Sequence, residues 1–144
     1  VVAGKKADLE SLVDTYKEAG AKRAIVLDMS VASHCELLNS AVEKLNPSLE
    51  EYITNDFNVS VISNVTANAY STKDEAVDLL GKQLVSPVKY KHSILANSEN
   101  VDMFIEFGNG SVLKGINRKI VKSIPTLNVS DFKTLESTLE QLND

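Results

Sequence analysis

Few residues in this chain could carry chemistry, and the stretch Ser33-His34-Cys35-Glu36 contains the strongest candidate. Ser33 and Glu36 have the spacing of a helix capping box, which predicts that His34 occupies the first position of a helix. There the positive end of the helix dipole disfavours the imidazolium by about 0.3–1 kcal/mol, so a neutral ring is expected. A neutral imidazole is what a general base needs near pH 7. A histidine that only helps to cap the helix has the same pattern, so the motif alone does not decide.

Cys35 and His92 are weaker candidates for chemistry. Neighbouring helix residues project about 100° apart, so Cys35 is not expected to be a nucleophile activated by His34 and is interpreted as a small buried hydrophobe. His92 shares an apolar stripe with Val88 and Leu95, which predicts a partly buried histidine. Because these residues lack the paired spacing of metal ligands, no metal site is predicted, and no cofactor is expected.

A glycine-rich segment, Gly108-Asn109-Gly110, lies between a predicted strand and a predicted helix. Backbone N–H groups at such a position can bind an anion. The segment has neither the lysine of a P-loop nor the pattern Gly-x-Gly-x-x-Gly, and tight turns often require glycine for their geometry alone. A turn is therefore the favoured interpretation.

The composition narrows the class of protein. The 144 residues are 43% hydrophobic and 24% charged, which is typical of one globular domain. A formal net charge of -5 argues against a general nucleic-acid binder. The single cysteine cannot form an intramolecular disulfide, which favours a reducing compartment, and we expect the cytoplasm. The longest apolar runs are far below the roughly 18 residues of a membrane helix, so no membrane association is expected.

Alternating helices and strands must position these residues. Helical periodicity or capping signals predict helices between Gly4 and Gly20, from Ser33 past Ile53, from Thr72 to Leu84, after Pro87, over Ser111–Lys122 and over Phe132–Leu142. Apolar runs predict strands over Lys22–Asp28, Val59–Ser63, Asp102–Phe107 and Pro125–Val129. This order predicts an α/β protein with a largely parallel sheet and no second self-sufficient domain.

Two local signals refine the helices. Thr72 and Glu75 form a second capping-box pattern. Pro47 should kink the long helix, and although Ser48 with Glu51 could restart it, a kinked continuous helix is favoured. At the start of the chain, Val1–Gly4 resembles the end of a strand and lacks a methionine, so further sequence is expected upstream.

Several segments resemble the malonyl-CoA:acyl carrier protein transacylase family, in the same order and from Val1 to about Leu142. The chain has Ala32 and Asn109 where the family usually has proline. The matching segments are Val1–Gly4, Gly20–Ala24, Ser30–Cys35, Ser63–Val65, Gln83–Leu84 with Pro87–Val88, and Gly108–Leu113.

The resemblance implies an α/β-hydrolase-like acyltransferase core with a largely parallel sheet, plus the end of a ferredoxin-like small subdomain. Residues 1–29 would be the second half of that subdomain, and residues 30–144 the C-terminal part of the core. The resemblance is therefore to the C-terminal half of the family, and a missing N-terminal half of the same protein is an expected partner.

In the family, a serine in Gly-His-Ser-x-Gly attacks malonyl-CoA and passes the malonyl group to the phosphopantetheine thiol of acyl carrier protein. By resemblance, His34 is the general base and the backbone carbonyl of Gln83 orients its ring. The serine, the oxyanion segment and the arginine that binds malonate lie in the upstream half. Neither Arg23 nor Arg118 matches that arginine.

A row of basic residues could serve the carrier protein. They lie at helical spacing opposite the apolar side of the predicted helix, and they are Lys114, Arg118, Lys119 and Lys122. The resemblance implies docking of the acidic acyl carrier protein here, whereas a solvated helix face explains the same pattern.

Three functions therefore stay open. The chain is expected to be part of an acyltransferase that acts on malonyl-CoA and acyl carrier protein. It could instead be a catalytically incomplete piece that only binds carrier protein or acts as a scaffold, or part of a polyketide synthase acyltransferase domain.

Overall fold

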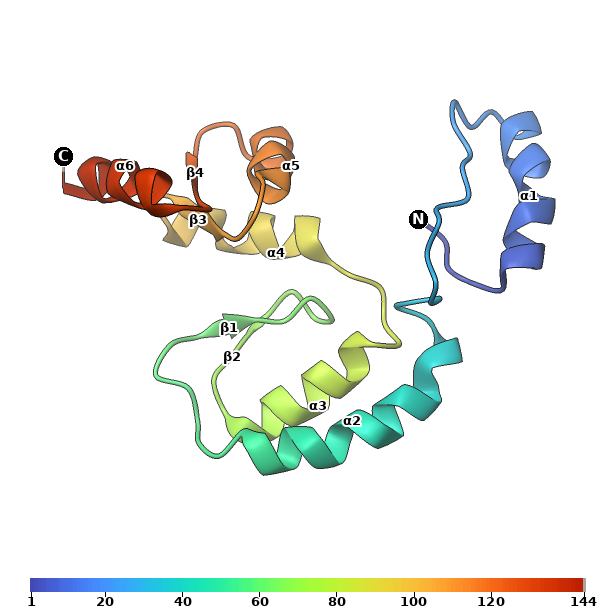
Figure 1. Cartoon of the computed structure of the whole chain (residues 1–144), viewed down its shortest axis with the longest axis horizontal. Helices are drawn as coiled ribbons and strands as arrows, with labels where there is room; N and C mark the ends of the chain where they lie inside the picture. Colours follow the sequence, from blue (N-terminus) through green and yellow to red (C-terminus); the bar gives the residue numbers. More distant parts are fainter. Residues whose placement is uncertain (144) are drawn as a thin grey trace. The chain divides into compact units, whose positions relative to one another are not determined.

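The computed structural model describes residues 1–143, which divide into two units, Val1–Val88 and the part from Lys89 onward (Figure 1). The first unit contains the helices α1 (Lys6–Glu18), α2 (Asn39–Tyr52) and α3 (Lys73–Gln83) and the 3-10 helix η1 (Glu36–Leu38). A short antiparallel pair, β1 (Val61–Ile62) with β2 (Ala69–Tyr70), lies between α2 and α3 in the sequence.

Helices α2 and α3 pack side by side and provide the frame of the first unit (Figure 1). The predicted capping box starts α3: the hydroxyl oxygen of Thr72 accepts from the Glu75 N–H, and the Glu75 carboxylate accepts from the Thr72 N–H. Helix α2 is continuous through Pro47, as predicted. The buried positions of α3 are Ala76, Val77 and Gly81.

The strand predicted over Lys22–Asp28 is wrong, because this segment makes no ladder with any part of residues 1–143. Ile25, Leu27 and Met29 are 56%, 65% and 67% exposed. An apolar run forms a strand only when another backbone segment pairs with it. The apolar pattern of the run does not show whether such a segment is present.

The second unit contains α4 (Tyr90–Asn97), the 3-10 helix η2 (Ser98–Asn100), β3 (Phe104–Phe107), α5 (Val112–Ile120), β4 (Thr126–Val129) and α6 (Phe132–Asn143). Strands β3 and β4 are parallel, in a register that runs from Phe104 opposite Thr126 to Phe107 opposite Val129. Helices α5 and α6 both contact β4, so the part of the unit from β3 to α6 is a β-α-β-α arrangement, and the α/β class is confirmed.

A buried polar network ties this unit together. Asn117 of α5 is only 3% exposed, and its side-chain oxygen accepts from the hydroxyl of Tyr90 at 2.8 Å. Its amide nitrogen donates to the hydroxyl of Thr126 at 3.3 Å. Burial raises the pKa of Tyr90, so this phenol stays a neutral donor. His92 of α4 is exposed, and the prediction that it is partly buried is wrong, because Ser93 and Ile94 form the buried side of that helix.

Within residues 1–143, no helix combines the length and the apolar character that crossing a membrane requires.

Candidate active site

His34 does not lie in a helix. Its φ is +64°, in the left-handed region, and η1 begins two residues later with Cys35 as an N-cap residue that makes no side-chain cap. The predicted capping box of Ser33 and Glu36 is therefore wrong, because a residue in this conformation cannot be the first of a right-handed helix. Because His34 is not the first residue of a helix, the predicted influence of a helix dipole on its ring is also wrong.

Two hydrogen bonds hold His34 against the end of α3. The backbone N–H of His34 donates to the carbonyl oxygen of Leu84 at 2.9 Å. The imidazole Nδ1 lies 2.9 Å from the carbonyl oxygen of Gln83. A left-handed non-glycine residue costs about 1–3 kcal/mol and persists only where its surroundings fix it, and these two bonds fix both its backbone and its ring.

The end of α3 offers these carbonyls because the helix stops there. In the last turn, the N–H groups of Leu84 and Val85 bond to the carbonyls of Gly81 and Lys82. Pro87 stands four residues after Gln83 and has no N–H, so it cannot give the helical bond that the Gln83 carbonyl would otherwise accept. That carbonyl is thus left for the His34 ring.

The contact with Gln83 determines the tautomer of the neutral ring. A backbone carbonyl only accepts hydrogen bonds, so the proton of the neutral His34 imidazole must be on Nδ1. The side-chain nitrogen of Gln83 is also 3.4 Å from Nδ1, but it is a donor too and cannot bond to a protonated nitrogen. The shorter carbonyl contact prevails. Nε2 therefore keeps its lone pair, on a residue that is exposed, and can accept a proton.

Cys35 does not pair with His34. Its thiol lies 3.3 Å from the carbonyl oxygen of Ala32, and the residue is half-buried rather than fully buried. Within residues 1–143, no group of three or more His, Cys, Asp or Glu residues is placed to hold a metal ion.

The start of α5 shows what the glycine segment does. Gly108 and Gly110 have φ values of +131° and +85°, which confirms the turn. The two oxygens of the Glu106 carboxylate accept from the N–H groups of Leu113 and Lys114, at 3.0 and 2.9 Å. The anion at this helix start is thus a side chain of the protein itself. Sequence reasoning missed Glu106, although a lone acidic residue inside an apolar strand was the available signal.

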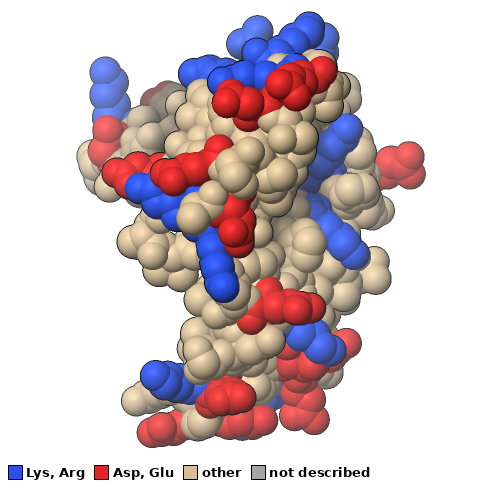
Figure 2. Space-filling model, turned by 90° about the vertical axis from the view of Figure 1, so that its right-hand side faces the viewer, with Lys and Arg blue, Asp and Glu red and all other residues tan. Residues whose placement is uncertain are grey.

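The predicted basic row is only partly helical. Lys114, Arg118 and Lys119 lie on α5, but Lys122 follows the end of that helix at Ile120, so the helix predicted to reach Lys122 is too long. All four side chains are exposed. Positive and negative side chains are interspersed on the face of the molecule in Figure 2.

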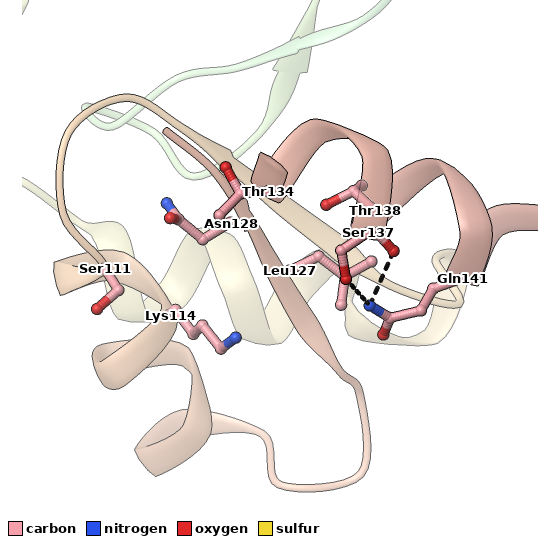
Figure 3. A pocket seen from close by; sticks show the side chains of 8 residues that line it. All are labelled: Ser111, Lys114, Leu127, Asn128, Thr134, Ser137, Thr138 and Gln141. Atoms are coloured by element: carbon pink, nitrogen blue, oxygen red, sulfur yellow. Dashed lines mark hydrogen bonds between the residues drawn. The ribbon is translucent and has the colours of Figure 1, made fainter. Parts of the chain in front are cut away.

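Lys114 also lines a cavity of about 260 Å³ between α5, β4 and α6 (Figure 3). The side chain of Gln141 there bonds to Ser137 of the same helix, as Figure 3 shows. The other lining residues are Ser111, Leu127, Asn128, Thr134 and Thr138. Lys114 is the one ionisable group of this lining in the described chain, and within residues 1–143 its amino group makes no hydrogen bond to a lining hydroxyl.

Comparison with known proteins gives a consistent result. No family model matches the chain. It is 39% identical over 145 residues to the malonyl CoA-acyl carrier protein transacylase of Bacillus subtilis, an alignment that covers 100% of the chain and 46% of that relative. The chain thus spans about half the length of the curated relatives it matches.

Solved structures agree. The malonyl-CoA:acyl carrier protein transacylase of Helicobacter pylori matches with a TM-score of 0.91 and 44% identity, over 98% of this chain and 45% of that one. A malonyl-transacylase in complex with a type II PKS acyl-carrier protein matches with a TM-score of 0.88 and 33% identity, over 96% of this chain and 45% of that one. The predicted acyltransferase fold and the resemblance to a C-terminal half are confirmed.

Proposed function

We propose that this chain, homologous over its whole length to the C-terminal half of the malonyl-CoA:acyl carrier protein transacylases, supplies the general base for malonyl transfer to acyl carrier protein. The observation that carries the proposal is the contact between His34 Nδ1 and the Gln83 carbonyl, which leaves Nε2 as the proton acceptor. The similar proteins are malonyl-CoA:acyl carrier protein transacylases, which supports this class of reaction.

In the first half-reaction, a serine hydroxyl of the N-terminal half gives its proton to His34 Nε2 as its oxygen attacks the thioester carbonyl of malonyl-CoA. The tetrahedral intermediate collapses, and the carbon–sulfur bond breaks. The imidazolium returns the proton to the departing thiolate of coenzyme A. The product is a malonyl ester on the serine.

In the second half-reaction, the phosphopantetheine thiol of acyl carrier protein gives its proton to the same Nε2 and attacks the ester. The ester bond breaks, and the serine oxygen recovers the proton. One ring nitrogen thus acts as base and acid twice, and His34 ends each cycle neutral.

The Gln83 carbonyl takes the place that a carboxylate has in a Ser-His-Asp triad. A neutral acceptor fixes the ring orientation and the Nδ1–H tautomer, while it attracts the imidazolium less strongly than a negative charge would. Because the acceptor is a backbone atom, the side chain of Gln83 is not required.

The exposed cations of the second unit are proposed as part of the docking surface for acyl carrier protein. They are Lys114, Arg118, Lys119 and Lys122. Opposite charge on an acidic partner raises the encounter rate, and the effect weakens with salt. One similar structure was solved with an acyl-carrier protein, which supports a carrier protein as the partner.

The test compares the full-length protein with this chain alone, using radiolabelled malonyl-CoA. The full-length protein should acquire label that survives denaturation and should pass it to acyl carrier protein. The isolated chain should remain unlabelled, because the nucleophile is proposed to lie in the other half. Stable label on the isolated chain would contradict that assignment. A full-length protein that binds carrier protein without taking label would favour the scaffold function instead.

A further inference from the structure

Helices α2 and α3 make a close contact at a glycine near the end of α3. Gly81 is buried, and a Cβ added there would lie 2.6 Å from Asn46 Oδ1 and 3.5 Å from Val42 Cγ1, both on α2. The first distance is far inside van der Waals contact. The two helices therefore approach this closely because residue 81 has no side chain.

The contact is locally unfavourable on both sides. A glycine inside a helix is destabilising relative to alanine. Asn46 Oδ1 is buried and has no hydrogen-bond partner within residues 1–143, and an unpaired buried oxygen is destabilising. These features favour a positioning role over a purely stabilising one.

Gly81 is connected directly to the atoms that hold His34. Its carbonyl accepts from the N–H of Leu84 at 3.3 Å, which closes the last turn of α3. The carbonyls of Leu84 and Gln83 in this turn are the two acceptors of His34, each at 2.9 Å. A displacement of α3 at Gly81 would thus move both acceptors together.

The geometry points to Gly81 as a positioning residue: its bare α-carbon seats α3 on Asn46 of α2 and so places the Gln83 carbonyl opposite His34 Nδ1. This inference rests on the proposed function, because the ring that it positions is the proposed base. A misplacement of about 1 Å at a catalytic group can lower a rate by roughly 100-fold, so a small shift of α3 should be measurable.

The experiment uses the full-length protein with Gly81→Ala, Asn46→Ala and the double variant. Gly115→Ala is the matched control, because Gly115 is also inside a helix but has no atom within 4 Å of an added Cβ. Two quantities are measured: the rate of malonyl-enzyme formation at saturating malonyl-CoA, with the apparent KM, and the tautomer of the His34 ring by ¹⁵N NMR.

We expect Gly81→Ala to slow acylation by about 10- to 100-fold at nearly constant KM and to reduce the Nδ1–H tautomer. Asn46→Ala in the same protein should restore both, because it removes the oxygen that the new methyl group meets. Gly115→Ala should change neither. If Gly81→Ala alone folds poorly, Asn46→Gln, which lengthens the side chain towards Gly81, should reproduce the loss of the tautomer.

Wild-type acylation and tautomer in Gly81→Ala would overturn the inference, and so would a loss that Asn46→Ala does not reverse. A wild-type protein that forms no malonyl-enzyme would instead contradict the proposed function. In that case the NMR readout still decides whether Gly81 positions the ring.

Discussion

The imidazole Nδ1 of His34 lies 2.9 Å from the backbone carbonyl oxygen of Gln83, a residue 49 positions further along the chain. The carbonyl is free because α3 ends there and Pro87 cannot donate to it. A loop residue with a left-handed backbone is thus held by the last turn of a helix, and Nε2 remains as the proton acceptor of the neutral ring.

Replacing the proposed base should abolish most of the activity. In the full-length protein, we expect His34→Ala to lower malonyl transfer to acyl carrier protein by at least about 100-fold, the scale of a lost general base. His92→Ala is the matched control, because His92 is exposed and its side chain forms no hydrogen bond within the described residues. Turnover by His34→Ala equal to that of the wild type would exclude this histidine as the base.

The side chain of Gln83 should be dispensable. Gln83→Ala keeps the backbone carbonyl that contacts Nδ1, so we expect turnover within about threefold of the wild type. Pro87→Ala, in contrast, introduces an N–H that can compete for this carbonyl, and it should slow the reaction. Steady-state kinetics of both variants check the pair, and a large defect in Gln83→Ala alone would show that the amide group acts.

Charge reversal on α5 should affect the carrier protein selectively. The double change Arg118→Glu and Lys119→Glu should raise the apparent KM for acyl carrier protein by about tenfold at low salt and weaken its salt dependence. Formation of the malonyl-enzyme from malonyl-CoA should hardly change. Lys5→Glu with Lys6→Glu makes the same charge change in the first unit. Equal effects of both double variants would leave only the solvated-face interpretation of the basic row.

Acid should weaken the helix starts. Hydrogen bonds from the Thr72 hydroxyl and from backbone N–H groups lower the pKa of Glu75, and bonds from Thr134 lower the pKa of Asp131. Because each pKa is lower in the folded protein, the unfolded chain binds more protons at pH values between the folded and the unfolded pKa. The contribution of these two carboxylates to the free energy of unfolding should therefore be complete above about pH 5 and should be lost as the pH falls through the lowered pKa values.

The measurement for this prediction is denaturant unfolding of the full-length protein between pH 3 and 7. Glu75→Gln keeps an acceptor at the capping position but does not titrate, so it should flatten the pH dependence. Glu99→Gln changes an exposed carboxylate that makes no hydrogen bond within residues 1–143 and should leave the slope unchanged. The same slope in the wild type and in Glu75→Gln would contradict a role of the cap.

Much of the helical framework could be predicted because its signals are local. The pair Thr72 and Glu75 lies within one turn, and the predicted capping box is present. The turn at Gly108 and Gly110 needs only the conformational freedom of glycine. The contact of Gln83 with His34 was proposed only through the family resemblance, since no local pattern relates residues so far apart.

The sequence by itself determined the α/β order, the capping box of α3 and the continuous helix through Pro47, and the family resemblance singled out His34 as the proposed base. Only the tertiary structure decided how that base is held. Ser33 and Glu36 have the spacing of a capping box, yet bonds from His34 to two carbonyls at the end of α3 keep its φ at +64° and exclude the helical start. In the same way, the apolar run at Ile25 did not become a strand, because pairing depends on a second backbone and not on the run itself.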